Sequence, residues 1–159
     1  LWQTFTEQIK AQFEKLLTNK MADKTIVEVP GASLFLKELR KTPSVAICFA
    51  TGSLRRPAIQ KLQAIGVDFE DQLLVASDRL SKRESIVKMA IVDAQKFYKL
   101  ESFDRVISVG DGLWDLKVAE NLGLEFIGIG EKNKLVLLEN GCLKHFDDFQ
   151  VFTYKDVLN

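Results

Sequence analysis

The chain has 159 residues, enough for one domain with a real core, because a domain of this size buries about 68–70% of the surface that its unfolded chain exposes. Its 22 Lys and Arg residues balance 22 Asp and Glu residues, so the formal net charge is zero. A neutral chain has no overall field that attracts nucleic acid or an anionic membrane, and we predict neither as a partner.

Cysteine usage and the first residues bear on the compartment. Two cysteines, Cys48 and Cys142, do not form a disulfide framework, and Cys48 lies in an apolar run where a thiol behaves as a small hydrophobic group. The opening LWQTFTEQIK lacks the basic-then-apolar order of a secretion signal, and no apolar run reaches the roughly 18 residues of a membrane span. We expect a soluble protein of the reducing cytoplasm.

The first predicted element is an amphipathic helix. Its apolar residues recur at helical spacing at Trp2, Phe5, Ile9, Phe13 and Leu16. Such a stripe usually packs into a core, so core is the first interpretation, and a partner-binding face is the second. The polar stretch TNKMADKT is expected to follow as a loop.

From Pro30 onwards strands and helices alternate. Pro30 and Gly31 mark the start of a second helix. The apolar runs SVAICFA, QLLVAS, RVISVG and EFIGIG are predicted strands, each followed by a helical pattern, one of them over about Lys82 to Tyr98. A last short strand is predicted around Gln150 to Phe152.

Alternating strands and helices, with strands apolar on both faces, indicate a parallel sheet covered by helices. We therefore predict the α/β class, as a three-layer, Rossmann-like sheet flanked by helices. In such sheets ligands bind beyond the carboxyl ends of the strands, which is where functional residues are sought.

Two acidic residues stand at the carboxyl end of the predicted strand RVISVG. Asp111 follows the strand directly and Asp115 lies one helical turn later, so both carboxylates can reach one point. Mg²⁺ prefers oxygen ligands and usually takes only one or two carboxylates from the protein, with waters and phosphate oxygens completing its shell. The sequence therefore predicts a Mg²⁺ site at Asp111 and Asp115.

Hydroxyl and basic residues follow two other predicted strands. Thr51 can hydrogen-bond a phosphate oxygen, while the N–H groups of Gly52 and Ser53 open a helix whose dipole favours an anion. A cation from Lys82 or Arg83 would neutralise the remaining phosphate charge. These residues predict a small phosphorylated ligand.

The same motifs resemble those of the haloacid dehalogenase-like (HAD) phosphohydrolase superfamily, from about Val29 to the C-terminus. The resemblance rests on a strand ending ATGS, the basic segment SKRESI, and a strand followed by GDGLWD, AENLG and FIGIG. It implies a Rossmann-like sheet, Mg²⁺ and an aspartate nucleophile that forms a phosphoaspartate, later hydrolysed by water. By the same resemblance Thr51 is the phosphate-binding hydroxyl, Lys82 the catalytic phosphate-neutralising cation, and Asp111 and Asp115 the metal acids. The family's lysine is commonly followed by proline, but here the chain reads SKRES, so Arg83 is an alternative to Lys82.

The family's nucleophile motif, an apolar strand ending in Asp-x-Asp, does not occur in these 159 residues. In the family this strand lies between the strand that ends at Thr51 and the strand that ends at Asp111. Its absence predicts a gap in the sheet with unpaired backbone groups, each costing about 1–3 kcal/mol when buried. We expect a fragment of a longer protein, with residues 1–28 as the remnant of a helical cap and residues 29–159 as the α/β core. The alternative is a relative whose gap is filled by another chain; the apolar face of the first helix would contact the missing segment or that chain.

Two main function classes follow. The first is a Mg²⁺-dependent hydrolase of small phosphate monoesters, active in the parent protein and inactive in this chain for want of its nucleophile. The second is a non-catalytic HAD-like domain that binds a phosphorylated ligand or a protein, although retained carboxylates beside a core are hard to explain without a cation. A dehalogenase is a weaker third option because it needs no Mg²⁺.

Several residues also have simpler interpretations. Ser53 is as well placed to cap a helix as to bind a ligand, and Arg55 and Arg56 are interpreted as a solvated helix face. His145 is the single histidine, so a Ser-His-Asp hydrolase would have to use it, and we do not expect it to be catalytic.

Overall fold

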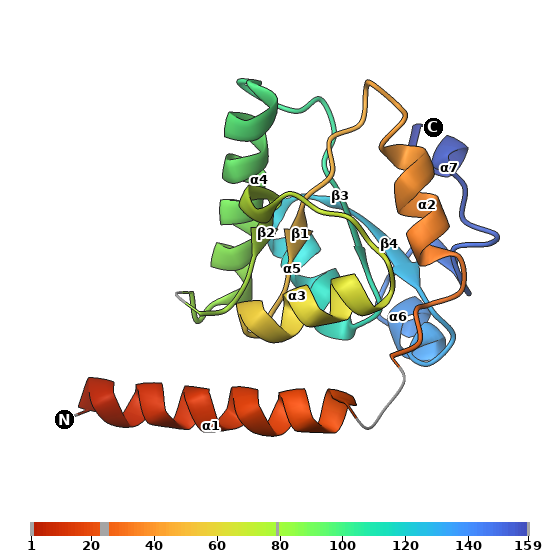
Figure 1. Ribbon diagram of the computed structural model, residues 1–159. Coiled ribbons are helices and arrows are strands. Elements are labelled where there is room, and N and C mark those ends of the chain that lie inside the picture. Colours follow the sequence, from red (N-terminus) through yellow and green to blue (C-terminus); the bar gives the residue numbers. More distant parts are fainter. Residues whose placement is uncertain (1, 23–25, 79, 159) are drawn as a thin grey trace.

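The computed structural model of the protein describes residues 2–22, 26–78 and 80–158, and its helices and strands alternate along the chain (Figure 1). The strands are β1 (Phe49–Ala50), β2 (Leu74–Val75), β3 (Ile107–Gly110), β4 (Glu125–Ile129) and β5 (His145–Phe146). The helices are α1 (Trp2–Ala22), α2 (Ala32–Leu39), α3 (Arg55–Ala64), α4 (Arg83–Tyr98), α5 (Leu113–Leu122), α6 (Lys134–Glu139) and α7 (Tyr154–Leu158), with a short 3₁₀ turn η1 at Asp71–Leu73.

All strand pairs are parallel, but they form two separate sheets. In one sheet β1 pairs with β2, and in the other β4 lies between β3 and β5. Helices α3, α5 and α6 make the crossovers between successive parallel strands, as parallel pairing requires. The predicted α/β class is confirmed, and the described residues contain no ladder between β1 and β3. The break lies where the sequence predicts a gap.

Helix α2 begins where local chemistry requires it. Gly31 precedes the helix in the left-handed conformation, with φ at 82°, and a Cβ there would lie 3.0 Å from the backbone of Phe149. The Glu28 carboxylate accepts the Ser33 N–H at 2.8 Å and the Ser33 hydroxyl at 3.1 Å, so it satisfies a donor of the first helical turn. The predicted start at Pro30 and Gly31 is therefore confirmed.

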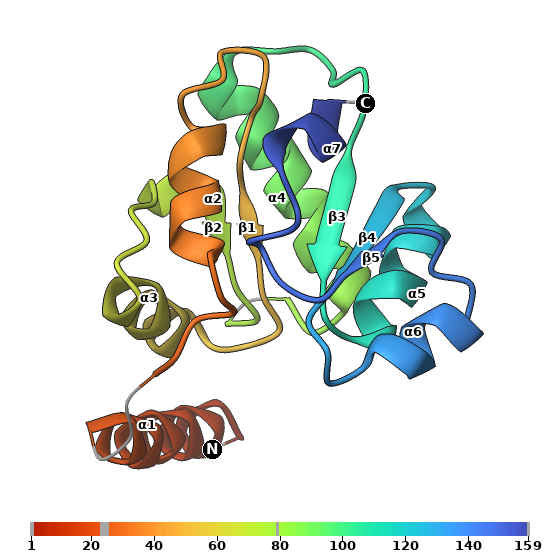
Figure 2. The ribbon, with the colours of Figure 1, turned by 90° about the vertical axis from the view of Figure 1, so that its right-hand side faces the viewer.

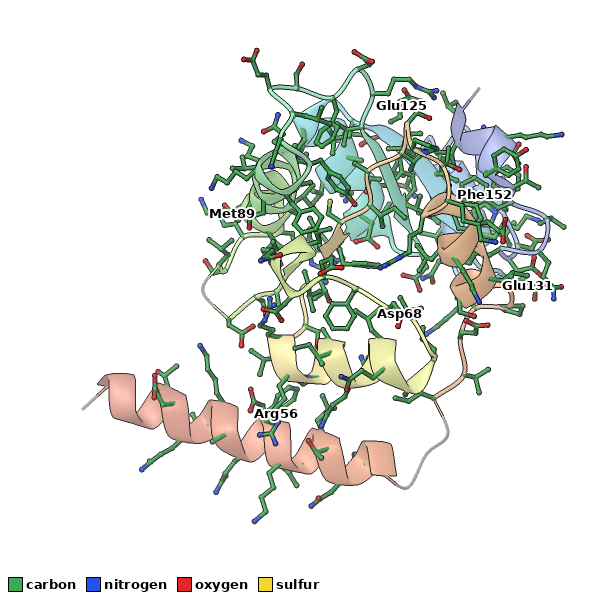
Figure 3. The ribbon with its side chains drawn as sticks, turned by 45° about the horizontal axis from the view of Figure 1, so that its top comes forward. Arg56, Asp68, Met89, Glu125, Glu131 and Phe152 are labelled. Carbon is green, nitrogen blue, oxygen red and sulfur yellow. The ribbon has the colours of Figure 1, made fainter. Side chains whose placement is uncertain are left out.

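Strand β4 separates two clusters of buried apolar side chains. Ile127 and Ile129 pack with α2 and with Phe152, whose ring centroid lies 4.6 Å from that of Phe35 (Figure 3). Phe126 points to the other face, where it packs against a cluster formed by Leu116, Leu137 and Cys142. The alternation follows from the period of two in a strand, and it explains why this run is apolar throughout.

The strand predicted around Gln150 to Phe152 is wrong. The last strand is β5, and residues 150–152 form a turn and an irregular segment. The Asp148 carboxylate accepts the N–H groups of Gln150 at 2.8 Å and Val151 at 3.2 Å, so these donors are not available to a ladder. The TNKMA part of the predicted loop is also wrong, because α1 continues to Ala22.

The apolar stripe of α1 is exposed in the described structure. Ile9, Phe13 and Leu16 are 54%, 50% and 64% exposed, so the prediction that they pack into the core is wrong. The side chains of Trp2 and Phe5 lie outside the described part of the chain. None of the described helices is long and apolar enough to cross a membrane.

Helix α1 runs along α3 (Figures 1 and 3), and polar side chains link the two helices. Glu14 approaches Arg56 at 4.0 Å, and Thr18 approaches Gln60 at 3.5 Å. Lys10 donates to the backbone carbonyl of Asp78 at 3.2 Å. Because α3 presents polar side chains on this surface, the polar side of α1 is the one that meets it.

Burial along the chain predicts unequal effects for two identical substitutions. Leu137 is fully buried and Leu143 is 98% exposed. We expect Leu137→Ala to lower the free energy of unfolding by about 2–5 kcal/mol, because it leaves a cavity. The matched control Leu143→Ala should change it by no more than about 0.5 kcal/mol. Urea titrations followed by circular dichroism measure both, and equal effects would contradict this arrangement of the core.

Candidate functional site

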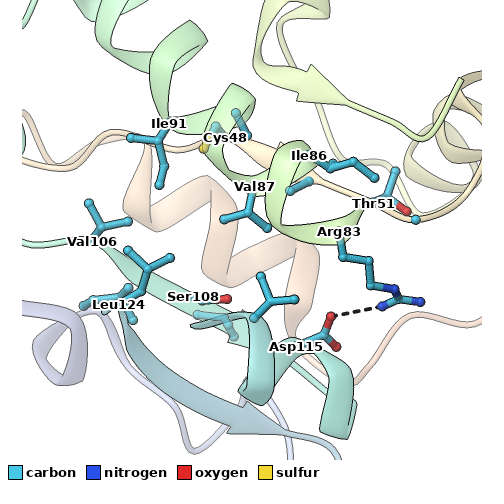
Figure 4. A pocket seen from close by; sticks show the side chains of 16 residues that line it. Cys48, Thr51, Arg83, Ile86, Val87, Ile91, Val106, Ser108, Asp115 and Leu124 are labelled. Carbon is cyan, nitrogen blue, oxygen red and sulfur yellow. Dashed lines mark hydrogen bonds and ion pairs between the residues drawn. The ribbon is translucent and has the colours of Figure 1, made fainter. Parts of the chain in front are cut away.

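A cavity of about 160 Å³ lies between β1 and β3, and we call it the slot. Figure 4 shows Cys48 and Thr51 on one side of the slot and Val106 and Ser108 on the other, with α4 between them. Most of the wall is aliphatic. It is lined by Cys48, Ala50, Thr51, Gly52, Arg83, Ile86, Val87, Ala90, Ile91, Val106, Ile107, Ser108, Val109, Asp115, Val118 and Leu124.

The strands beside the slot are less buried than the strands beyond them. Val109 in β3 is 41% exposed and Ala50 in β1 is exposed, whereas both residues of β2 are buried. Figure 2 shows β1 and β3 running in the same direction without touching. Each strand therefore has a ladder partner on one side and the slot on the other.

Just before β1, a side chain satisfies backbone groups where a strand partner would otherwise do so. The Tyr98 hydroxyl lies 3.2 Å from the Ile47 nitrogen and 3.3 Å from the Ile47 carbonyl oxygen, accepting from the first and donating to the second. The end of α4 thus fixes the chain that leads into the slot.

Thr51 lies at the carboxyl end of the slot, as its place after a predicted strand indicates. Its hydroxyl oxygen accepts the N–H of Ser53 at 3.1 Å, and its own N–H is bound to Val75 across the sheet at 2.9 Å. The acceptor role toward Ser53 leaves the hydroxyl proton of Thr51 available as a donor. The same bond occupies the Ser53 N–H, one of the donors expected to bind an anion.

The start of α3 is capped by Asp78 and not by Ser53. The Asp78 carboxylate accepts the N–H of Arg55 at 2.7 Å, and the Ser53 side chain makes no cap bond. Ser53 instead accepts the N–H and the hydroxyl of Ser77 on its carbonyl, each at 3.0 Å. The cap interpretation of Ser53 is wrong, since Asp78 takes that role. The backbone of Ser53 links the loops that follow β1 and β2.

Of the two candidate cations, Arg83 is the one at the slot. Its guanidinium lies 3.5 Å from Asp115, and Figure 4 shows it between Thr51 and Asp115. A Cβ on Gly52 would lie 3.3 Å from the same group, so Gly52 leaves room for it. Lys82 is the exposed residue that precedes α4 and is not among the residues that line the slot.

Asp115 packs against the turn that ends β3. A Cβ on Gly110 would lie 2.6 Å from the Cβ of Asp115, closer than two such atoms can come. Gly112 donates its N–H to Asp115 Oδ2 at 3.1 Å, which leaves Oδ1 turned toward Arg83. The GDG sequence is therefore required by close contact with the carboxylate, in addition to any turn preference.

Burial raises the pKa of the Asp115 carboxyl, and the negative charge of Asp111 raises it further. The hydrogen bond from Gly112 and the positive charge of Arg83 oppose this effect without cancelling it.

Asp111 itself is exposed and does not line the slot. Asp111 and Asp115 supply the oxygen donors that Mg²⁺ prefers, so the residues present fit such an ion. The described residues hold no group of three His, Cys, Asp or Glu side chains that could bind a metal. The remaining ligands would have to be water, phosphate oxygens or groups from outside this part of the chain.

Three polar residues make structural contacts that are not predicted from the sequence. Asp78 caps α3, Asn133 donates to the Asp111 carbonyl at 2.8 Å, and Arg55 binds Asp71 at 2.6 Å and the Leu74 carbonyl. Arg55 is thus wrongly interpreted as a solvated residue, whereas Arg56 is exposed. Asp78 and Asn133 both follow predicted strands, and this position indicates that their side chains can reach the loops at the carboxyl edge. His145 has a side chain only 2% exposed and lies away from the slot lining.

No protein-family model and no curated protein matches this chain.

The raised pKa of Asp115 predicts a pH-dependent gain from Asp115→Asn. A carboxyl with a higher pKa in the folded than in the unfolded chain destabilises the fold when it is ionised, and this penalty disappears once both states are protonated. We expect Asp115→Asn to raise the free energy of unfolding at pH 7, in the absence of divalent cations. The gain should shrink as the pH falls toward the ordinary pKa of an aspartate. Urea titrations across that range test this, with exposed Asp104→Asn as control; a gain that grows on acidification would contradict it.

Proposed function

We propose that this chain carries the phosphate-binding and metal-binding residues of a Mg²⁺-dependent phosphate-monoester hydrolase of the HAD-like type. The observation that carries the proposal is that Thr51, Arg83 and Asp115, distant in the sequence, line the carboxyl end of one cavity. A hydroxyl donor, a cation and a carboxylate at one edge of parallel strands suit a phosphate with its metal ion. The substrate class is a small phosphorylated metabolite.

Thr51 and Arg83 would bind the phosphate group. The Thr51 hydroxyl accepts the N–H of Ser53, so its own proton is free to be donated to a phosphate oxygen. Arg83 has the planar guanidinium that suits phosphate oxygens, and its 3.5 Å contact with Asp115 is loose enough to exchange. We therefore assign the phosphate-neutralising role to Arg83 in preference to Lys82.

Asp111 and Asp115 would hold the Mg²⁺ ion. When bound, such an ion neutralises the charge that develops on the phosphoryl oxygens. The Gly112 N–H already fixes Oδ2 of Asp115, so Oδ1 is the oxygen available to a cation. Arg83 would then be released from Asp115 toward the phosphate.

The nucleophile would come from a strand that this chain does not contain. We propose that an apolar strand ending in Asp-x-Asp occupies the slot, pairs with β1 and β3, and completes one Rossmann-like sheet. Its last residues would then lie beside Thr51, Arg83 and Asp115. Residues 1–28 would belong to a cap over this edge, in keeping with the Lys10 contact to the Asp78 carbonyl.

A second candidate is a domain that binds phosphate without turnover. It is favoured by one observation, the absence of any Asp-x-Asp sequence in the chain. Binding and turnover are separable, because binding needs only the residues that the chain has.

Turnover of a generic aryl phosphate separates the two candidates. We expect no turnover by the chain alone, and Mg²⁺-dependent turnover when a linker attaches an apolar strand ending in Asp-x-Asp to its N-terminus. Asp111→Asn in the extended chain should lower kcat by about 10²-fold or more, while exposed Asp104→Asn should not. Phosphate binding without turnover in the extended chain would favour the second candidate, and neither binding nor turnover would exclude both.

The thiol of Cys48 reports directly on occupation of the slot. Cys48 lines the slot, and burial raises the pKa of its thiol, with the charge of Asp93 adding to the effect. Since the thiolate is the reactive form, we expect slow alkylation of Cys48 in the chain alone and much slower alkylation in the extended chain. Iodoacetamide labelling in a Cys142→Ala background, followed by mass spectrometry, measures this. Equal rates in the two chains would show that the added strand does not enter the slot.

A further inference from the structure

Asn133 links two loops at the carboxyl edge of the second sheet. It lies in the loop between β4 and α6, and its Nδ2 donates to the backbone carbonyl of Asp111 at 2.8 Å. Asp111 lies in the loop between β3 and α5. The bond therefore joins neighbouring βα loops through the residue that carries one of the two proposed metal acids.

The side chain of Asn133 does not do what an asparagine at this position usually does. Asn133 is the residue that precedes the first turn of α6, where asparagine commonly accepts an N–H of its own helix. Here it makes no such cap bond. Its amide donates to the Asp111 carbonyl instead. Helix α6 therefore lacks a side-chain cap at Asn133.

The backbone of Asn133 is well anchored. Its carbonyl accepts the N–H of Leu137 at 2.9 Å, and Leu137 is fully buried against Leu116 and Cys142. The Nδ2 donor thus extends from a fixed point of the core, which suits a group that has to hold another loop in place.

The Asp111 loop is held from its other side by Asp115. Gly112 donates to Asp115 Oδ2 at 3.1 Å, and Gly110 is packed so closely on Asp115 that a Cβ would lie 2.6 Å away. The main chain of Asp111 therefore lies between two attachments, Asp115 within the same helix start and Asn133 from the next loop. Together these attachments set the position from which the Asp111 side chain leaves the backbone.

We propose that Asn133 is a positioning residue for the metal site, and that it sets the distance between the carboxylates of Asp111 and Asp115. The inference rests on the proposed function, since it concerns the cation that these carboxylates would share. Asn133 does not itself contact the ion. Residues that orient metal ligands typically contribute 10- to 100-fold to affinity.

The test compares the two asparagines that flank α6. Asn133→Leu removes the donor to Asp111 without adding charge. Asn140→Leu is the matched control, because Asn140 Nδ2 also donates to a backbone carbonyl at 2.8 Å, that of Val136, away from the slot. Asn133→Gln keeps the amide donor and tests for rescue.

Mg²⁺ titrations of the whole chain, followed by the ¹⁵N shifts of Gly110 and Gly112, measure affinity at the loop itself. We expect Asn133→Leu to weaken Mg²⁺ binding about 10-fold, Asn133→Gln to recover part of the loss, and Asn140→Leu to leave affinity within twofold. Amide hydrogen exchange at residues 110–112 should accelerate in Asn133→Leu alone.

Two results would overturn the inference, and they are distinguishable. If the unmodified chain binds Mg²⁺ and Asp111→Asn abolishes binding, but Asn133→Leu binds as tightly as the unmodified chain, the positioning role is wrong and the proposed metal site stands. If the unmodified chain shows no Mg²⁺ binding at millimolar concentration, the metal site and the positioning role both fall.

Discussion

A parallel strand inside a covered sheet needs a hydrogen-bonded neighbour on each side, and β1 and β3 have one each. This constraint accounts for the main features of the structure. The sheet divides into two, an aliphatic cavity of about 160 Å³ separates the parts, and strand residues such as Val109 remain 41% exposed. α4 and α5 both contribute to the wall of this cavity, so the helical layer is continuous where the sheet is not.

Polar residues from three separate parts of the chain meet at the carboxyl end of the slot. The turns after β1 and β3 bring Thr51 and Asp115 to one end of the cavity, and α4 begins with Arg83 beside them. Three features of the backbone make this possible: the Thr51 hydroxyl is fixed by Ser53, the glycines around Asp111 admit the Asp115 carboxylate, and Gly52 admits the guanidinium.

Helix α1 shows that amphipathicity alone does not decide which face of a helix is buried. Its stripe of Ile9, Phe13 and Leu16 predicts burial, yet these residues are exposed while Glu14 and Thr18 contact α3. The side of α3 that meets α1 offers an arginine and a glutamine, and side chains of this kind pair with Glu14 and Thr18 in preference to apolar groups. The stripe and the slot share one property: both are apolar surfaces that the described residues leave partly uncovered.

The order of elements could be predicted from the sequence, because each depends on local patterns. Apolar runs bounded by turn residues identified the strands, Gly31 identified the start of α2, and the GDG turn identified the carboxylates after β3. These features need no knowledge of distant contacts, since they follow from spacing and from the backbone needs of single residues. The gap in the sheet was predicted from the resemblance to the HAD-like superfamily alone.

Only the tertiary structure decided which polar groups meet. Arg83 and Lys82 are neighbours in the sequence, and the start of α4 places one at the slot and the other in solvent. Asp78 takes the start of α3 that Ser53 was expected to cap, and Asn133 reaches Asp111 across 22 residues. Asp148 turns the chain where a last strand was expected. The contacts of Arg83, Asp78 and Asn133 join residues that are distant in the sequence, so residue spacing carries no information about them. The bonds of Asp148 are local, but they compete with a strand whose pairing depends on the rest of the sheet.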